Sequence, residues 1–224
     1  MATMTEEPTG YGQYCPISRA VEVLGERWTV LIIRDLLLGN DRFNELSRAS
    51  PGLSRSLLSK RLRQLERAGI VDHVDDRYEL TDAGRELEPL VFGIGQWGAK
   101  WAFGEPRPAE LDPQILMWWI HQRLDFSMLP ERRWVLAFLF SDARERFWIV
   151  RDAAGTSICM SEPDFATDAT VSTDLTTMYR VWSCRESMSG ALRSGRLQFE
   201  GDRRLVRNLP KVFELSPLPV PAVS

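Results

Sequence analysis

The sequence predicts an α+β fold in two domains, and three observations support this prediction. Residues 42–71 hold two amphipathic helical patterns separated by a Ser-Pro-Gly break, and two short strand patterns follow them. The segment GEPRPAELDP at residues 104–113 has three prolines and no periodicity, as linkers do. Beyond it, helical and strand patterns alternate. We therefore expect a flexible tail at 1–14, a first domain at 15–103, a linker at 104–112, a second domain at 113–216 and another tail at 217–224.

The first domain opens with two short helices. One covers residues 17–24 and is stopped by Gly25, and the other covers residues 28–38 and is stopped by Gly39. The second helix is dense in leucine and isoleucine. Four of its large apolar side chains are expected in the core: Trp28, Leu31, Ile32 and Leu36.

The helix expected at residues 54–68 carries the central motif. Ser54 is a good N-cap, and Gly69 follows the last apolar position as a stop. Leucines at positions 58, 62 and 65 recur at helical spacing and face a core. Another face presents small hydroxyl and basic side chains: Ser56, Ser59, Lys60 and Arg63. Small residues allow close approach to a groove wall, and cations reach phosphates or guanine edges, so this pattern indicates a DNA-binding helix-turn-helix.

Basic residues are concentrated on this motif, although the whole chain is slightly acidic. The chain has 28 basic and 31 acidic residues, a net charge of −3, which argues against a protein that coats nucleic acid. Residues 42–67 hold seven basic and two acidic residues, a local net charge of +5. A charge run is, however, usually a solvated helix face. The residues of this region expected to contact DNA are Arg42, Ser54, Arg55, Ser56, Ser59, Lys60 and Arg63.

A wing is expected after the motif. Residues 70–71 and 78–80 are short apolar steps around a polar turn, and Arg77 lies near its tip. A basic residue there can enter a minor groove or contact a phosphate, although a solvated turn arginine is an equal alternative. Thr81 then caps a long helix that runs to Trp101.

This long helix carries an apolar stripe of four turns or more. We expect the stripe to form a two-fold dimer contact, because a small winged domain has little surface to cover it; packing within the chain is the alternative. Together with Ile17, the predicted dimer interface contains Leu87, Leu90, Val91, Ile94, Trp97 and Trp101.

The first domain resembles the HxlR family of bacterial winged-helix transcription regulators. The resemblance rests on Cys15-Pro16, LGERWTVLIIRDLLLGNDRF, PGLSRSLLSKRLRQLERAGIV, YELTDAGREL and QWGAKW, and it covers roughly residues 15–101. It implies a homodimer that binds pseudo-palindromic promoter DNA and pairs through terminal helices. The wing is shorter than is usual in the family, so the resemblance favours contacts by the helix over contacts by the wing.

The second domain begins with a helix at 113–124. Strands are expected at 133–140, 147–151, 157–160 and 169–172, then helices from Asp174 to Trp182 and at 187–193, a strand at 196–200 and a helix from Asp202. This order predicts an α/β sandwich with a largely antiparallel sheet. The strand at 133–140 is apolar on both faces, so one face would meet helices and the other a cavity or a second protomer.

Residues 174–213 resemble the sterol carrier protein 2 domain. The positions that carry the resemblance are Asp174, Gly195, Gly201 and Asp202, whereas Cys184 stands where that family often has glycine. The resemblance implies an apolar tunnel for a lipid or another apolar small molecule, although an apolar stripe is more often plain core. Candidate ligand-binding residues are Trp118, Trp119, Trp134, Leu136, Phe138, Phe140, Trp148, Met178 and Trp182.

Catalysis, metal binding and membrane insertion have little support. The two histidines, His73 and His121, belong to no recognisable catalytic constellation, and the three cysteines lack metal-site spacing. We expect no enzyme activity, no cofactor and no metal. Neither a signal peptide nor an apolar span of about 20 residues is present, so we expect a cytoplasmic protein without a membrane partner.

Cys15 is a candidate redox residue. Some HxlR-like regulators use a cysteine at this position as an oxidant sensor, and a helix that begins near Pro16 would lower the pKa of its thiol. A small apolar residue at the dimer contact is the alternative.

Taken together, these features predict a homodimeric regulator that binds double-stranded DNA and responds to an apolar molecule held in the second domain. One alternative is an apolar-ligand carrier whose winged domain serves only dimerisation. Another is a regulator that senses oxidants through Cys15.

Overall fold

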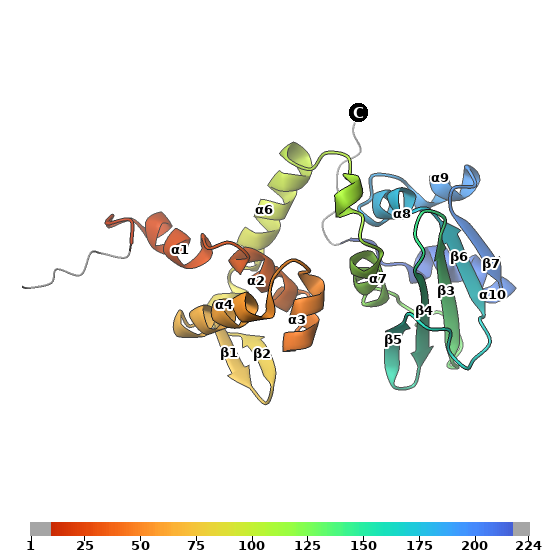
Figure 1. The fold of residues 1–224 in the computed structure, drawn as a ribbon, viewed down its shortest axis with the longest axis horizontal. Helices are drawn as coiled ribbons and strands as arrows, with labels where there is room; N and C mark the ends of the chain where they lie inside the picture. Colours follow the sequence, from red (N-terminus) through yellow and green to blue (C-terminus); the bar gives the residue numbers. More distant parts are fainter. Residues whose placement is uncertain (1–9, 217–224) are drawn as a thin grey trace, which may run out of the picture. The chain divides into compact units, whose positions relative to one another are not determined.

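The structure, a computed structural model, describes residues 10–216, and the chain divides between Gly93 and Ile94 into two compact units (Figure 1). Most of the predicted tails at 1–14 and 217–224 falls outside the described residues, and residues 10–14 form no helix or strand. The predicted linker at 104–112 belongs to the second unit. Its start is held there, because the guanidinium of Arg185 donates hydrogen bonds to the carbonyl oxygens of Phe103 and, at 2.7 Å, Gly104.

The first unit contains a helix-turn-helix with a wing. It begins with four helices, α1 (Pro16–Leu24), α2 (Thr29–Leu37), α3 (Phe43–Ala49) and α4 (Arg55–Arg67). Strands β1 (Val71–Val74) and β2 (Arg77–Leu80) follow as an antiparallel hairpin in which Val71 faces Leu80. α3 and α4 flank a turn at residues 50–54, and the hairpin is the wing. The winged helix-turn-helix predicted from the sequence is therefore confirmed.

The core of this unit lies among α2, α3, α4 and β1. Its most deeply buried side chains are Ile32, Ile33, Leu46, Leu58, Leu62, Leu65 and Val71. Burial of one such side chain contributes about 1.5–3 kcal/mol. Of the core residues predicted in α2, Ile32 and Leu36 are buried and Trp28 packs against the cluster. Leu31 is 39% exposed instead, at the edge of the buried face, since successive residues of a helix point about 100° apart.

The long helix expected after the wing is broken into two. α5 (Asp82–Arg85) ends after one turn, and α6 (Glu88–Trp101) begins after a turn at Glu86 and Leu87. The cause is Pro89, which lacks a backbone N–H and disfavours helical geometry in the preceding residue. A proline is tolerated in the first turn of a new helix, where α6 places it. α6 also crosses the boundary between the two units.

The second unit is a five-stranded sheet with helices. The helices are α7 (Pro113–His121), α8 (Leu175–Trp182), α9 (Met188–Arg193) and α10 (Arg203–Val212), and η1 (Pro108–Glu110) is a short 3-10 turn. The strands are β3 (Trp134–Phe140), β4 (Arg146–Asp152), β5 (Gly155–Cys159), β6 (Ala169–Thr173) and β7 (Gln198–Gly201). They are ordered β5-β4-β3-β6-β7, with β3 and β6 parallel and the other neighbours antiparallel. The sheet is therefore mixed and largely antiparallel.

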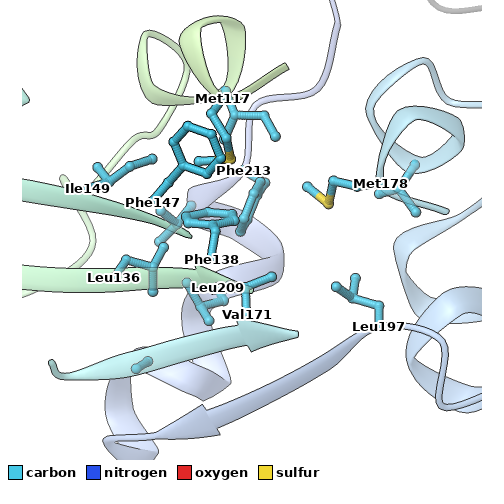
Figure 2. Close-up of a cluster of buried hydrophobic side chains, with 14 of the residues drawn as sticks. Met117, Leu136, Phe138, Phe147, Ile149, Val171, Met178, Leu197, Leu209 and Phe213 are labelled. Carbon is cyan, nitrogen blue, oxygen red and sulfur yellow. The ribbon is translucent and has the colours of Figure 1, made fainter. Parts of the chain in front are cut away.

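Both faces of β3 are buried within the unit. Trp134, Leu136 and Phe138 point to one face, where they join apolar side chains of α7, α8, α9 and α10 in the main core. Figure 2 shows Phe138 at the centre of this core, with Met117 of α7 and Leu209 of α10 beside it. On the other face, Val135, Ala137, Trp148 and Val150 form a smaller cluster. The two-sided burial expected from the sequence is thus satisfied inside the chain.

Local chemistry accounts for the ends of the helices in this unit. The carboxylate of Asp174 accepts the backbone N–H of Thr177 at 2.7 Å, and that of Asp202 accepts those of Arg204 at 2.8 Å and Leu205 at 3.0 Å. Cys184 follows α8 and adopts a φ of 61°. That conformation is one that glycine adopts at no steric cost, so the turn keeps the geometry a glycine would favour.

Candidate nucleic-acid interface

One side of α4 fixes the helix to the first unit. Leu58, Leu62 and Leu65 are fully buried, and the hydroxyl of Ser54 caps the helix by accepting the backbone N–H of Leu57 at 3.3 Å. Gly69 ends the helix with a φ of 69°, a left-handed conformation that glycine adopts readily. Both predicted ends of the helix are therefore correct to within a residue.

A buried arginine gives a second attachment. Arg61 is only 7% exposed, and its guanidinium donates to the carbonyl oxygen of Arg27 at 3.1 Å, to Oε1 of Gln64 at 2.7 Å and to Oε2 of Glu26 at 2.6 Å. These contacts join α4 to the segment before α2. Arg61 was one of the seven basic residues in the local charge count, so part of that charge is internal.

The opposite face of α4 is available to a partner. Ser56, Lys60 and Arg63 are exposed, and Ser59 is half-buried. Arg63 donates to the hydroxyl of Ser59 at 2.7 Å, which steadies a long side chain that would otherwise lose more rotamer freedom on binding. The structure therefore brings together the four residues that the sequence predicts for the groove.

Arg67 belongs to the same face and was missed. It is exposed, and it follows Arg63 by four residues and Lys60 by seven, which places all three on one side of the helix. The helical spacing in the sequence was sufficient to find it. The row of cations on α4 therefore extends to the last residue of the helix.

The other predicted contacts surround the start of α4. Arg42 is exposed at the start of α3, and its backbone N–H donates to the Glu45 carboxylate at 3.1 Å. Arg55 is exposed but partly engaged, since it donates to Oδ1 of Asn44 at 3.1 Å and lies over the ring of Phe43. Arg55 consequently links α4 to α3 as well as facing solvent.

The wing has less free positive charge than the sequence suggested. Arg77 forms an ion pair with Asp41, and the backbone N–H of Tyr78 donates to the carbonyl oxygen of Asp41 at 2.7 Å. The turn itself consists of Asp75 and Asp76, both with positive φ. Two carboxylates at the tip repel phosphate, and the one basic residue beside them is neutralised, so the helix carries the favourable charge.

A buried carboxylate stabilises the turn between α3 and α4. Asp35 of α2 is almost completely buried, and it accepts hydrogen bonds from Arg34 at 2.6 Å and from the hydroxyl of Ser50 at 3.0 Å. Burial raises the pKa of Asp35, and the neighbouring Arg34 partly offsets that effect. Ser50 is the first residue of the turn, so this contact helps to fix the angle between α3 and α4.

Comparison with known proteins assigns the first unit. The sequence profile described as HxlR-like helix-turn-helix matches residues 23–105. A protein of Bacillus subtilis (strain 168) named "Uncharacterized HTH-type transcriptional regulator YvaP" is 39% identical over 97 residues, which cover 40% of this chain and 90% of that protein. The chain belongs to the HxlR-like helix-turn-helix family.

Further relatives of this HxlR-like chain include one from Mycobacterium tuberculosis (strain ATCC 25618 / H37Rv), "Uncharacterized HTH-type transcriptional regulator Rv3095". It is 40% identical over 99 residues, which cover 41% of this chain and 60% of that protein. Among solved structures, quinone-bound YodB from B. subtilis is similar at 36% identity and a TM-score of 0.35, over 38% of this chain and 96% of that one. The family match at 23–105 contains α2 to α6.

Most of the side chains predicted to form the dimer interface are exposed. Leu90, Ile94, Trp97 and Trp101 of α6 are between 57% and 68% exposed, and Ile17 of α1 is 73% exposed. Val91, by contrast, is 8% exposed and packs into the core of the first unit, and Leu87 packs against the same cluster. Val91 of α6 and Leu87, in the turn before that helix, thus lie apart from the exposed stripe.

Cys15 immediately precedes α1. The backbone N–H groups of the first turn, that of Ser18 above all and then that of Ile17, lower the pKa of the Cys15 thiol. The Cys15 thiol therefore loses its proton more readily than the thiol of an isolated cysteine.

The candidate ligand residues of the second unit do not all converge. Most belong to the main core: Trp134, Leu136, Phe138, Phe140, Met178 and Trp182, with Trp119 packed against them. Trp148 lies in the cluster on the opposite face of the sheet, because alternate residues of a strand point in opposite directions. Trp118 is half-buried beside His121, with ring centroids 4.6 Å apart. Trp148 is thus separated by the sheet from the residues with which it was grouped.

Two features are absent from residues 10–216. In this range no cluster of three or more His, Cys, Asp or Glu side chains is arranged to hold a metal ion. Over the same residues, no helix is both long and apolar enough to cross a bilayer.

Proposed function

We propose that this chain is a DNA-binding transcriptional regulator that binds pseudo-palindromic promoter DNA as a homodimer. The observation that carries the proposal is the row of Ser56, Lys60 and Arg63, presented outward by a helix that buried leucines and Arg61 hold in place. Family membership and the regulator names of its relatives point the same way. A row of this kind positions the helix on phosphates and reads guanine edges in a major groove.

Dimerisation is part of the proposal because α6 exposes large apolar side chains. Leu90, Ile94, Trp97 and Trp101 recur at helical spacing, and a monomer gains nothing by leaving such a stripe in water. A two-fold contact would bury the stripe against its own copy. It would also present two α4 helices to half-sites about 34 Å apart.

The DNA contact is tested with the double variant Lys60→Ala with Arg63→Ala. The matched control is Arg144→Ala with Arg193→Ala, which removes two exposed cations from the second unit. Duplexes selected from a random pool by the wild-type chain are titrated in gel shifts at several salt concentrations. We expect the α4 variant to bind at least about 30-fold more weakly, since each base contact contributes about 1–3 kcal/mol.

Salt dependence supplies an independent readout. Loss of two cationic contacts should reduce the slope of log affinity against log salt by up to about 2. The control should retain both affinity and slope. Unchanged binding by the α4 variant would show that this face of α4 is not the DNA contact. A wild-type chain that selects no duplex from the pool would contradict the DNA assignment and favour a carrier whose winged unit serves only dimerisation.

We also propose that the second unit holds an apolar effector in a fold like that of sterol carrier protein 2. Its core is rich in adaptable side chains, since Met117, Met178 and Met188 lie among the buried aromatic residues. Figure 2 shows the first two of these methionines. Methionine side chains repack readily and so can admit a ligand at low cost. An effector that alters the spacing of the two α4 helices would change operator affinity through a coupling free energy of about 1–3 kcal/mol.

The effector is tested by mass spectrometry of molecules released on denaturing the purified chain, followed by re-addition of those molecules. The expected result is an apolar compound that raises the melting temperature and changes DNA affinity. A chain that carries nothing, and whose melting temperature does not respond to palmitate or a sterol, would argue against this part.

A second mode of regulation is favoured by one observation, the lowered pKa of Cys15. Oxidation of this thiol would then release DNA. Cys15→Ser should abolish the effect of peroxide on gel shifts. It should leave the DNA affinity measured without peroxide unchanged. Oxidant-dependent release that persists in Cys15→Ser would exclude this role.

A further inference from the structure

The outer face of α10 is strongly cationic. Leu205, Leu209 and Val212 are buried in the main core, and Figure 2 shows Leu209 beside Phe138 and Val171. Four exposed basic side chains occupy the opposite side of the helix: Arg203, Arg204, Arg207 and Lys211. At 100° per residue they share an arc of about 100°. Residues one turn apart in this row repel each other, so the arrangement lowers stability unless an anion is bound.

This face forms one wall of a groove. Met128, Leu129 and Pro130 form the other wall, and together with Asn208 and the four cations they enclose about 860 Å³. None of the eight lining residues is acidic. A groove of this volume falls within the range of sites that hold small organic molecules, about 300–1,000 Å³.

The four cations have few internal counter-ions over residues 10–216. Their side chains form no ion pair there, and the nearest carboxylate in sequence, that of Asp202, is engaged as the cap of α10 and lies 4.0 Å from Arg132. The charge of Asp202 nevertheless acts on Arg204. The protein therefore compensates only part of the positive charge of the groove.

We propose that this groove binds an organic molecule that carries at least two phosphoryl groups and an apolar portion. Arg203 and Lys211 are eight residues apart, about 12 Å along the helix, which exceeds the reach of a single phosphate. Guanidinium groups pair with phosphate oxygens through two parallel hydrogen bonds. Met128, Leu129 and Pro130 provide the surface for the apolar portion. This inference extends beyond the regulator proposal and does not rest on it.

The experiment is a calorimetric titration of the full chain with ATP and with inorganic tripolyphosphate, at about 150 mM salt to suppress weak surface attraction. The groove variant is Arg203→Ala with Arg207→Ala, and the matched control is Arg144→Ala with Arg193→Ala, which makes the same change in net charge outside the groove. Thermal melts of all three proteins establish that they are folded.

We expect saturable binding with one site per chain, at least tenfold weaker in the groove variant and within twofold of wild type in the control. ATP should bind more tightly than tripolyphosphate, because the apolar wall adds contacts with the base. Met128→Ser should remove that difference between the two ligands and leave tripolyphosphate binding intact.

Three results would overturn the proposal. One is the absence of saturable heat with either ligand up to millimolar concentration, and another is an equal loss of binding in the groove variant and the control. The third is that the groove variant weakens binding of duplex DNA, or of phosphatidylglycerol vesicles, without affecting either polyphosphate. Since DNA binding by α4 is measured with different variants, failure here leaves the regulator proposal intact, and the reverse also holds.

Discussion

Helix α6 and strand β3 both have apolar sequences, but they differ in how much of their large apolar side chains is exposed to solvent. α6 leaves Trp97 and Trp101 more than half exposed, whereas β3 buries Trp134 and Phe138 almost completely. The difference arises from the neighbours that each element meets. Four helices and two further strands supply apolar partners to β3, while α6 turns only Val91 fully into a core. An apolar stripe therefore predicts burial, and the fold decides whether the partner is the same chain or another.

The largest loss of stability expected from this comparison follows substitution of Phe138. Its side chain is 0% exposed, and its ring contacts that of Phe213 at a centroid distance of 6.1 Å. Phe138→Ala should destabilise the second unit by about 3–5 kcal/mol, measured by urea unfolding. The control Phe165→Ala removes a ring that is 44% exposed and lies under the guanidinium of Arg133, and it should cost about 1 kcal/mol or less. Equal costs for both variants would show that β3 is not packed as described.

A smaller effect on folding, and a large one on assembly, is expected at α6. Ile94→Ser with Trp97→Ser should leave the stability of the monomer nearly unchanged, because both side chains are exposed. Sedimentation equilibrium should show dimerisation weakened by about 30-fold or more, since a central apolar residue of an interface contributes about 2 kcal/mol. Met160→Ser with Phe165→Ser removes exposed apolar groups elsewhere and should have no effect. A wild-type chain that is monomeric at all concentrations would refute the homodimer.

The smallest effect is expected at Asp35, a polar group that is buried like the residues of β3. Because burial raises its folded-state pKa, the folded chain holds the proton more tightly than the unfolded chain does. The stabilisation is complete below the ordinary pKa of about 3.9 and is lost as the pH rises through the folded value. The unfolding free energy of the wild type minus that of Asp35→Asn should therefore fall as the pH rises through that window. A difference that rises with pH would show that hydrogen bonds to the carboxylate outweigh its burial.

Local signals in the sequence predicted the elements well. Ser54 and Gly69 bounded α4, and Asp174 and Asp202 marked the starts of α8 and α10, because caps and stops act within one turn of the chain. Helical spacing alone was enough to predict that Ser56, Ser59, Lys60 and Arg63 share one face of α4. The break before α6 could also have been predicted, because Pro89 disfavours a continuous helix.

Relations between distant residues could not be predicted in the same way. The burial of Arg61 depends on Glu26 and on the carbonyl of Arg27, and the ion pair of Arg77 depends on Asp41. Neither partner can be identified by spacing. Trp148 was grouped with Trp134 because both are apolar, but the register of β3 and β4 decides which face each occupies.

The position of Arg61 also affects how loss-of-function variants should be interpreted. Under the proposed function, a genetic screen for chains that no longer control a promoter would recover Arg61 together with Lys60 and Arg63, because Arg61 holds α4 in place and the other two would contact DNA. Arg61 would do so without touching nucleic acid, because its hydrogen bonds run inward to Glu26 and Arg27. A substitution there would act on every operator alike, whereas a change at Arg63 would alter the preference among operators. Comparing several target sequences would distinguish a displaced helix from a lost contact.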